Sequence, residues 1–221
     1  IGTFGHTFTA EGDRLTIGTG TPGYQVIPLP WRYLKRNPEL SIPSVERNAA
    51  QYQSTFPIAK PHPWRERRAS DPGFSKYYTD HYGKSESTPS GYFTSACSPF
   101  IYRDVAFPKE YWGHNFSCEP AQNLIHHSVP TWDGSILNLL KGGEEGKEFL
   151  SSTDQWFHPM NLSHGPEGAI YITDFYREII EDYSAIPRYL QQQYGLVNGK
   201  QHGRVWRLTH EEAPDAPIAR M

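Results

Sequence analysis

Residues 160–176 read MNLSHGPEGAIYITDFY and decide the fold class. Pro166 presets the backbone for a turn, and Gly168 supplies a residue that readily adopts positive φ, so we expect the chain to reverse direction there. From Ala169 to Asp174 the side chains alternate in character with a period of two residues, which is typical of a β-strand. The stretch therefore predicts two antiparallel strands joined by a tight turn.

Two other stretches share this plan of an apolar segment, a turn with an acidic residue and glycine, and an alternating strand. The first is FGHTFTAEGDRLTIG at 4–18, which turns at Glu11-Gly12. The second runs from 91 to 140 and turns at Asp133-Gly134. HGRVWRLTH at 202–210 alternates as well. Four-stranded units that repeat every ~40–50 residues are the signature of a β-propeller. The sequence therefore predicts an all-β fold of propeller type.

A long insertion, from about Glu39 to Pro89, interrupts this pattern. Its prolines are Pro43, Pro57, Pro61, Pro63, Pro72 and Pro89. Proline removes a ladder donor, so we expect an irregular excursion here rather than sheet. Such long loops often serve as lids or partner contacts. The basic cluster at 65–68 reads as a solvated loop face in preference to an anion site.

The rest of the sequence predicts one short helix, one domain and a C-terminal tail. A short helix is expected from Pro187 to Tyr194, because proline suits a first turn and Gly195 suits a stop. We assign residues 1–210 to one partial propeller domain and residues 211–221 to a C-terminal tail. The chain starts at Ile1 without a signal peptide, which suggests a mature product or an excised piece.

Composition excludes several classes of function. The 221 residues carry a formal net charge of −3, with 19 Gly, 19 Pro and 14% aromatic residues. No basic stripe is present to neutralise phosphates, so we expect no nucleic-acid partner. No apolar run approaches the ~18–20 residues that span a bilayer, so we expect no transmembrane segment.

Two cysteines bear on the compartment. Cys97 and Cys118 lie in neighbouring strand-like segments, and a disulfide between them would staple the strands in an oxidising compartment. The alternative is a pair of buried thiols. No Cys-x-x-Cys occurs, so the chain attaches no covalent c-type haem and forms no thiolate zinc site.

One family shows several of these motifs in the same order. They are RYLKRNP at 32–38, FTSAC at 93–97, NFSCEPAQNLIHH at 115–127, the stretch at 143–181 that contains WFHPMNL, and HGRVWRL at 202–208. The pattern resembles the membrane-bound dehydrogenase domain of planctomycetes, a sorbosone/glucose-dehydrogenase-like β-propeller, and matches its C-terminal half. The part from Cys97 to Arg177 is the most specific.

The resemblance implies about three blades of a six-bladed ring, completed by another chain or by residues outside this sequence. It implies a periplasmic or secreted dehydrogenase that oxidises a sugar or polyol and passes electrons to a c-type cytochrome. It also implies pyrroloquinoline quinone (PQQ) and calcium as cofactors. The alternative is a non-catalytic scaffold or carbohydrate-binding subunit of a larger extracellular or redox complex.

Candidate site residues follow from the blade openings that face the axis of such a ring. An alcohol oxidation needs a base near neutral pH, and His158 is the first choice, with His6 second; a structural histidine is the alternative for each. Arg177, Tyr176 and Asp174 are the candidate cofactor-binding residues, although Asp174 and Arg177 also read as a structural ion pair. Asp174 and Glu119 are the candidate calcium ligands.

The chain departs from the resembled family where the quinone would bind. Phe157-His158-Pro159 offers neither the arginine nor the asparagine that such dehydrogenases use, and TGTPGY at 19–24 replaces an asparagine-rich stretch. A quinone with three carboxylates needs cationic partners. The adjacent His126 and His127 are expected to be structural, because successive strand side chains point in opposite directions.

Overall fold

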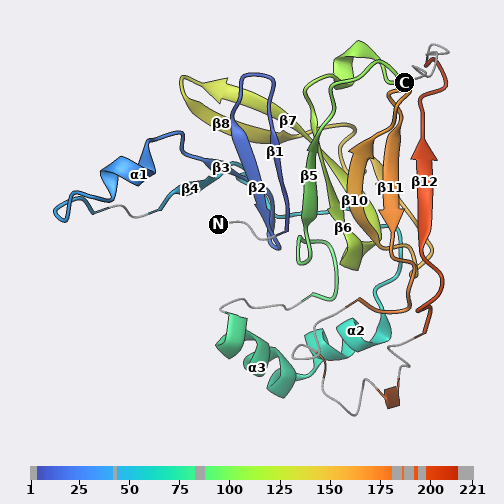
Figure 1. Ribbon diagram of the computed structural model, residues 1–221. Coiled ribbons are helices and arrows are strands. Elements are labelled where there is room, and N and C mark those ends of the chain that lie inside the picture. The colour runs from blue at the N-terminus through green and yellow to red at the C-terminus, as the bar shows by residue number, and fades with distance from the viewer. Residues whose placement is uncertain are drawn as a thin grey trace.

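A computed structural model describes residues 4–41, 44–82, 88–180, 186, 192–193 and 198–213 of the chain. The described residues are mostly β and form three antiparallel sheets in chain order (Figure 1). They do not form a closed ring. The expected helix from Pro187 to Tyr194 lies almost entirely outside these residues.

The first sheet has the order β1-β2-β3-β4. Its strands are β1 (His6–Phe8), β2 (Arg14–Gly18), β3 (Thr21–Val26) and β4 (Glu46–Asn48). The β1–β2 hairpin turns where the sequence predicted, and Gly12 has a φ of 92° there, which costs glycine little. β4 lies within the stretch that was expected to contain no sheet, so that expectation was wrong for these three residues.

The second sheet has five strands in the order β5-β6-β7-β8, with β9 paired to β7. They are β5 (Cys97–Ile101), β6 (Asn115–Glu119), β7 (Leu124–Asp133), β8 (Ile136–Lys141) and β9 (Leu150–Ser151). A 3-10 turn at Pro120–Gln122 joins β6 to β7 and ends at Asn123, whose φ is 57°. Asparagine tolerates this left-handed conformation better than most residues. The predicted turn at Asp133-Gly134 joins β7 to β8, with Gly134 at a φ of 60°.

The third sheet has the order β10-β11-β12. Its strands are β10 (Pro159–His164), β11 (Ile170–Asp174) and β12 (Arg204–Leu208). The turn predicted at Pro166–Gly168 joins the first two strands, and the alternation from Ala169 onward matches β11. β12 pairs with β11 in unbroken register from Ile170↔Leu208 to Asp174↔Arg204.

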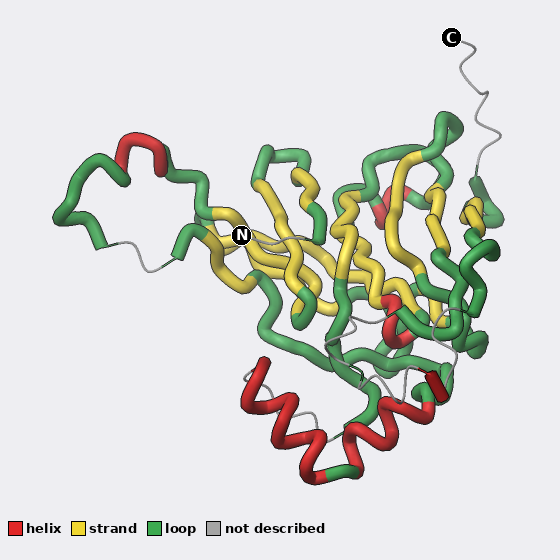
Figure 2. The backbone as a smooth tube through the Cα atoms, turned by 60° about the horizontal axis from the view of Figure 1, so that its bottom comes forward, coloured by secondary structure: helices red, strands yellow, loops and turns green. Residues whose placement is uncertain are grey.

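Helices occupy part of the proline-rich insertion, where only irregular loops were expected. α1 (Trp31–Leu34) lies before it, and α2 (Pro63–Ser70) and α3 (Pro72–Tyr82) lie within it. Proline at the first position of a helix loses no hydrogen bond and has a suitable φ, so Pro63 and Pro72 begin helices. Arg65 and Arg68 are buried rather than solvated. α2 and α3 lie beyond one end of the sheets (Figure 1; Figure 2).

Apolar side chains fill the junctions between the sheets. Leu15, Ile101, Leu137 and Leu139 are among those between the first and second sheets. A larger cluster joins the second and third sheets and includes Phe100, Phe116, Ile125, Leu162 and Ile172. The first strands of the three sheets are neighbours, with β5 between β1 and β10. None of the described helices is long and apolar enough to cross a membrane.

Candidate functional site

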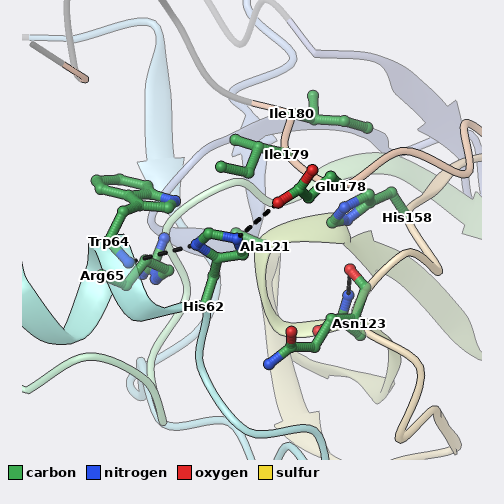
Figure 3. A pocket seen from close by; sticks show the side chains of 10 residues that line it. His62, Trp64, Arg65, Ala121, Asn123, His158, Glu178, Ile179 and Ile180 are labelled. Atoms are coloured by element: carbon green, nitrogen blue, oxygen red, sulfur yellow. Dashed lines mark hydrogen bonds and ion pairs between the residues drawn. The ribbon is translucent and has the colours of Figure 1, made fainter. Parts of the chain in front are cut away.

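A pocket lies where the open ends of the second and third sheets meet α2 (Figure 3). His158 reaches it from the residue before β10, and Asn123 from the β6–β7 turn. His62 reaches it from the start of α2, and Glu178 from the segment after β11. Segments far apart in the sequence therefore build one site.

His158 contributes a buried imidazole ring to the lining of this pocket. Its side chain is 6% exposed, and Nδ1 lies 2.8 Å from the Pro120 carbonyl oxygen. A carbonyl only accepts, so Nδ1 carries the hydrogen and Nε2 presents its lone pair. Nε2 is buried and has no hydrogen-bond partner among the described residues. Burial lowers the pKa of His158 and outweighs the opposing effects of the Pro120 carbonyl, Asp174 and the backbone of Glu178 and Arg177, so the neutral ring is favoured near pH 7.

Asp174 holds the His158 backbone rather than its ring. One carboxylate oxygen accepts from the His158 amide at 2.8 Å and from the Tyr176 amide at 3.0 Å. The other accepts from the Trp206 indole at 3.0 Å. The carboxylate is fully buried and has three donors, which is the arrangement that a buried charge requires. Asp174 is therefore a positioning residue for His158.

His62 and Glu178 form the outer side of the pocket. His62 caps α2, because its Nδ1 accepts from the Trp64 amide at 3.3 Å. Its Nε2 lies 3.6 Å from one oxygen of Glu178, whose other oxygen accepts from Asn198 at 2.6 Å. Burial lowers the pKa of His62 more than Glu178 raises it, and His158 lowers it further. The pair connects the insertion to the segment that follows β11.

The pocket is small. Its volume is about 30 Å³, enough for roughly two water-sized groups. Asn123 shapes one wall, and its amide is fixed by the carbonyls of Gln155 and Phe157 at 3.1 and 2.8 Å. Arg65 also lines the pocket, but its guanidinium donates to the Pro89 carbonyl and contacts the Tyr92 hydroxyl. The site therefore suits a hydroxyl group that donates to His158 Nε2, rather than a large anion.

The other sequence-predicted residues lie outside this pocket. His6 is exposed on β1 and stacks edge-on against Phe8 at 5.8 Å. Tyr176 packs against Trp156, and the guanidinium of Arg204 lies 3.4 Å from its ring centre. Arg177 lies over the Phe175 ring at 4.2 Å, so the geometry does not support the ion-pair interpretation with Asp174.

Glu119 is fully buried in a separate polar cluster. Its carboxylate accepts from the amides of Thr94 and Ser95, each at 3.1 Å, and from the Ser95 hydroxyl at 2.5 Å. Burial raises the Glu119 pKa to about 7 and outweighs these hydrogen bonds and Arg65.

PQQ and calcium do not fit the residues assigned to them. The oxygens of Asp174 and Glu119 are occupied by donors within the protein, and the two carboxylates belong to different clusters. No group of three His, Cys, Asp or Glu side chains in the described part of the chain could hold a metal. The His158 pocket is also far smaller than a tricyclic quinone. No chemical step is therefore assigned to either cofactor.

The two cysteines are buried partners across the β5–β6 ladder, Cys97 directly opposite Cys118. Both are free thiols in the structure. The Cys97 thiol donates to the Met160 carbonyl oxygen at 3.5 Å. The register is the one that the predicted disulfide needs, and the bond itself stays a prediction.

The adjacent histidines point in opposite directions, as the strand period predicted. His126 lies between the Tyr52 hydroxyl at 2.8 Å and the Glu148 carboxylate at 2.7 Å. His127 pairs with His114 at 2.9 Å and stacks on Phe116. Both contacts are internal, which agrees with the structural interpretation.

Sequence reasoning missed His62 and Glu178. His62 precedes Pro63, and a polar residue before proline at the start of a helix is a recognisable capping signal. This capping signal could have been used if the insertion had been predicted to contain helices. Glu178 had no such signal, since only the fold brings it to His62.

A protein-family model matches nearly the whole chain. The family described as "Domain of unknown function (DUF7133)" matches residues 1–212. No curated protein and no solved structure matches the chain.

Proposed function

The chain belongs to the DUF7133 family, and we propose that it is a propeller-type domain that binds a hydroxyl group of a small sugar or polyol at His158. The observation that carries this proposal is the buried Nε2 of His158, an acceptor without a partner among the described residues. Leaving such a group unpaired costs about 1–3 kcal/mol, which a ligand hydroxyl would recover.

The local geometry supports a hydroxyl over other donors. The pocket volume of about 30 Å³ admits a single protruding group rather than a whole ring. An ammonium group would be favoured by the Glu178 carboxylate, but His62 and Asn198 already engage both oxygens of Glu178. A neutral O–H donor fits the neutral, low-pKa imidazole without adding a buried charge.

The propeller architecture is part of the same proposal. Three antiparallel sheets follow one another in the chain, and their first strands β1, β5 and β10 are neighbours, as blades around an axis would be. We propose that these sheets are about half of a six-bladed ring, completed by another chain or by residues outside this sequence. A stable lone monomer in native mass spectrometry would argue against that completion.

Binding is tested with a matched pair of variants. In His158→Asn, the amide Nδ2 replaces Nδ1 as donor to Pro120, while the acceptor Nε2 is lost. His6→Asn makes the same change at an exposed histidine on β1. Calorimetric titration with a panel of sugars and polyols should show binding that weakens at least tenfold in His158→Asn and is unchanged in His6→Asn. Equal binding by both variants would remove the proposal.

A second candidate function is oxidation of the bound alcohol by a periplasmic or secreted dehydrogenase. The specific observation in its favour is that His158 is neutral near pH 7 and presents a lone pair, which is the state that a general base needs. In this role Nε2 takes the hydroxyl proton. The carbon-bound hydrogen leaves with the two electrons, as a hydride, to a free quinone supplied from solution, and a c-type cytochrome is the proposed onward partner.

Dye reduction distinguishes the two candidates. The purified assembly is mixed with each sugar that binds and with a two-electron dye, before and after addition of quinone. Reduction that depends on both the sugar and His158 supports the dehydrogenase. Binding without reduction under any of these conditions supports a carbohydrate-binding or scaffold subunit of a larger complex.

A further inference from the structure

A second and larger cavity lies between β9 of the second sheet and the strands of the third sheet. Its volume is about 290 Å³, close to the lower end of the range for small-molecule sites. The residues that line it are Leu150, Ser151, Ser152, Phe157, Ile172, Trp206, Arg207 and Leu208. Protein interiors hold few voids larger than a water molecule, so a gap of this size beside the core indicates room for a bound molecule.

The register of the third sheet determines which side chains face this cavity. Trp206 lies opposite Ile172, and directly opposed residues of an antiparallel pair share one face of the sheet. Leu208 is two residues beyond Trp206 and points to the same side. Leu208 and Leu150 of β9 both pack against the core cluster that contains Ile172. The cavity therefore continues the apolar core between the second and third sheets.

The charged side chains of β11 and β12 are all engaged away from the cavity. Arg207 points to the opposite face of the sheet, where its Nε donates to Glu167. Asp174 is on the cavity side, but its buried carboxylate already accepts from three donors within the protein. The guanidinium of Arg204 lies 3.4 Å from the ring centre of Tyr176. A molecule in this cavity would find no charged partner on these two strands.

Two aromatic side chains form walls of the cavity. The Trp206 indole is 45% exposed, and its N–H donates to Asp174 at 3.0 Å, which fixes the position of the ring. Phe157 is buried and lines the cavity, whereas its neighbour His158 lines the small pocket. The cavity and the His158 pocket are therefore separate sites.

Water gains little in this cavity. The leucine, isoleucine and phenylalanine side chains of the lining form no hydrogen bonds. The two serine oxygens are already used as acceptors, that of Ser151 by the Ile58 amide at 3.3 Å and that of Ser152 by the Asp154 amide at 3.0 Å. An apolar molecule that displaces water from such a space is bound by the hydrophobic effect.

From this lining we infer that the cavity binds a neutral, flat molecule of about two fused rings. An apolar cavity of ~150 Å³ holds one benzene ring, and this cavity is roughly twice as large. The rings would pack against Trp206 and Phe157. A sugar is disfavoured, because its hydroxyls would face apolar side chains without a partner, and an ion is disfavoured by the cost of burying an unpaired charge. The site is independent of the hydroxyl site proposed at His158.

The test uses quinoline as the probe, because it is a water-soluble bicyclic aromatic that is neutral at pH 7.5. N-methylquinolinium carries a positive charge on the same rings, and 2-naphthoate carries a negative charge on rings of the same size. Calorimetry should show saturable binding of one quinoline per chain and at least tenfold weaker binding of both ions. Absence of saturable quinoline binding, or equal affinity for either ion, would overturn the inference.

Two variants fill the cavity from different strands. Leu150→Trp and Leu208→Phe should each weaken quinoline binding at least tenfold, and thermal unfolding shows whether each variant still folds. Arg207→Met, on the opposite face of β12, is the matched control and should leave the affinity unchanged. Unchanged affinity in a folded Leu150→Trp or Leu208→Phe variant would overturn the inference. If neither variant folds, the comparison of the three probes on wild type still decides it.

Two further measurements locate the bound molecule. Displacement of quinoline by glucose would overturn the inference in favour of a sugar site. A tenfold loss of affinity in Arg207→Met would place the molecule on the opposite face of the sheet and would also overturn it. His158→Asn should bind quinoline normally, so this inference and the function proposed at His158 fail separately.

Discussion

The buried Asp174 carboxylate accepts a hydrogen bond from the His158 amide at 2.8 Å, and the His158 carbonyl in turn accepts from the Phe175 amide at 2.9 Å. These bonds tie the start of β10 to the end of β11. They hold the backbone of His158 while the Pro120 carbonyl orients its ring. A base predicted from the sequence and a carboxylate predicted to bind a cofactor are thus parts of one positioning unit.

Replacing this carboxylate should destabilise the fold. In Asp174→Asn, the amide group would face donors where the carboxylate accepted them, and at least one buried N–H would lose its partner. We expect the free energy of unfolding to fall by about 2–4 kcal/mol. Urea denaturation measures this loss, with Asp133→Asn, at the exposed last residue of β7, as control. Equal stability of the two variants would contradict the positioning role.

The Tyr52–His126–Glu148 chain should be a second stabilising unit. The side chains of His126 and Glu148 are both 0% exposed, and Glu148 also accepts from the Phe56 amide at 2.9 Å. In Glu148→Gln, an amide NH2 group would face a donor where a carboxylate oxygen accepted one, so the substitution should cost about 1–3 kcal/mol. Urea denaturation of the variant and of wild type measures this difference in the free energy of unfolding.

Tyr52→Phe should cost less, about 1 kcal/mol, because only a hydroxyl bond is lost. Tyr33→Phe is the matched control, since Tyr33 is 63% exposed. If Glu148→Gln were as stable as Tyr33→Phe, the buried chain would contribute nothing measurable.

Glu119 should make stability fall as the pH rises. Its folded pKa is raised to about 7 from an ordinary 4.5, so between these values the folded state binds the proton that the unfolded state has released. The contribution of Glu119 to the free energy of unfolding is fully present below about pH 4.5. It is lost between about pH 4.5 and pH 7, and the loss is about 3 kcal/mol. The stability of wild type relative to Glu119→Gln should therefore fall between pH 5 and pH 7.5, as measured by the urea midpoints of the two proteins at each pH.

The comparison must be made between variants at each pH, because His127 acts in the opposite direction. Burial and the neighbouring His114 lower the His127 pKa to about 3, so its contribution is lost as the pH falls below about 6.5. Glu39→Gln, on an exposed carboxylate, should keep the wild-type pH dependence. An identical pH dependence in Glu119→Gln and wild type would refute the assignment to Glu119.

The cysteine pair should form a disulfide on oxidation. Cys97 and Cys118 are opposite one another in the ladder, and closing a loop of this length stabilises a chain by about 3 kcal/mol. Alkylation after unfolding without reductant should label neither cysteine in oxidised protein and both after reduction. The midpoint of urea unfolding should rise on oxidation in wild type and stay unchanged in Cys97→Ser. Labelling of both thiols in oxidised protein would show that the pair stays reduced.

The sequence by itself determined the local structure. The residues Pro166–Gly168, Glu11-Gly12 and Asp133-Gly134 indicated their turns, because proline restricts φ and glycine readily adopts positive φ. The period of two from Ala169 onward indicated β11. The opposite directions of His126 and His127 follow from the same period. His158 was identified because its residue type and its place at the opening of a strand were both visible in the chain.

Tertiary structure decided everything that depends on distance in space. Glu178 meets His62 only because α2 folds across the end of the sheets, and Trp206 meets Asp174 only because β12 pairs with β11. Glu119 and Asp174 looked like free ligands in the sequence, and their oxygens are occupied by donors that the fold delivers. A side chain's burial, its partners and its pKa depend on segments distant in the sequence, so no local pattern could supply them.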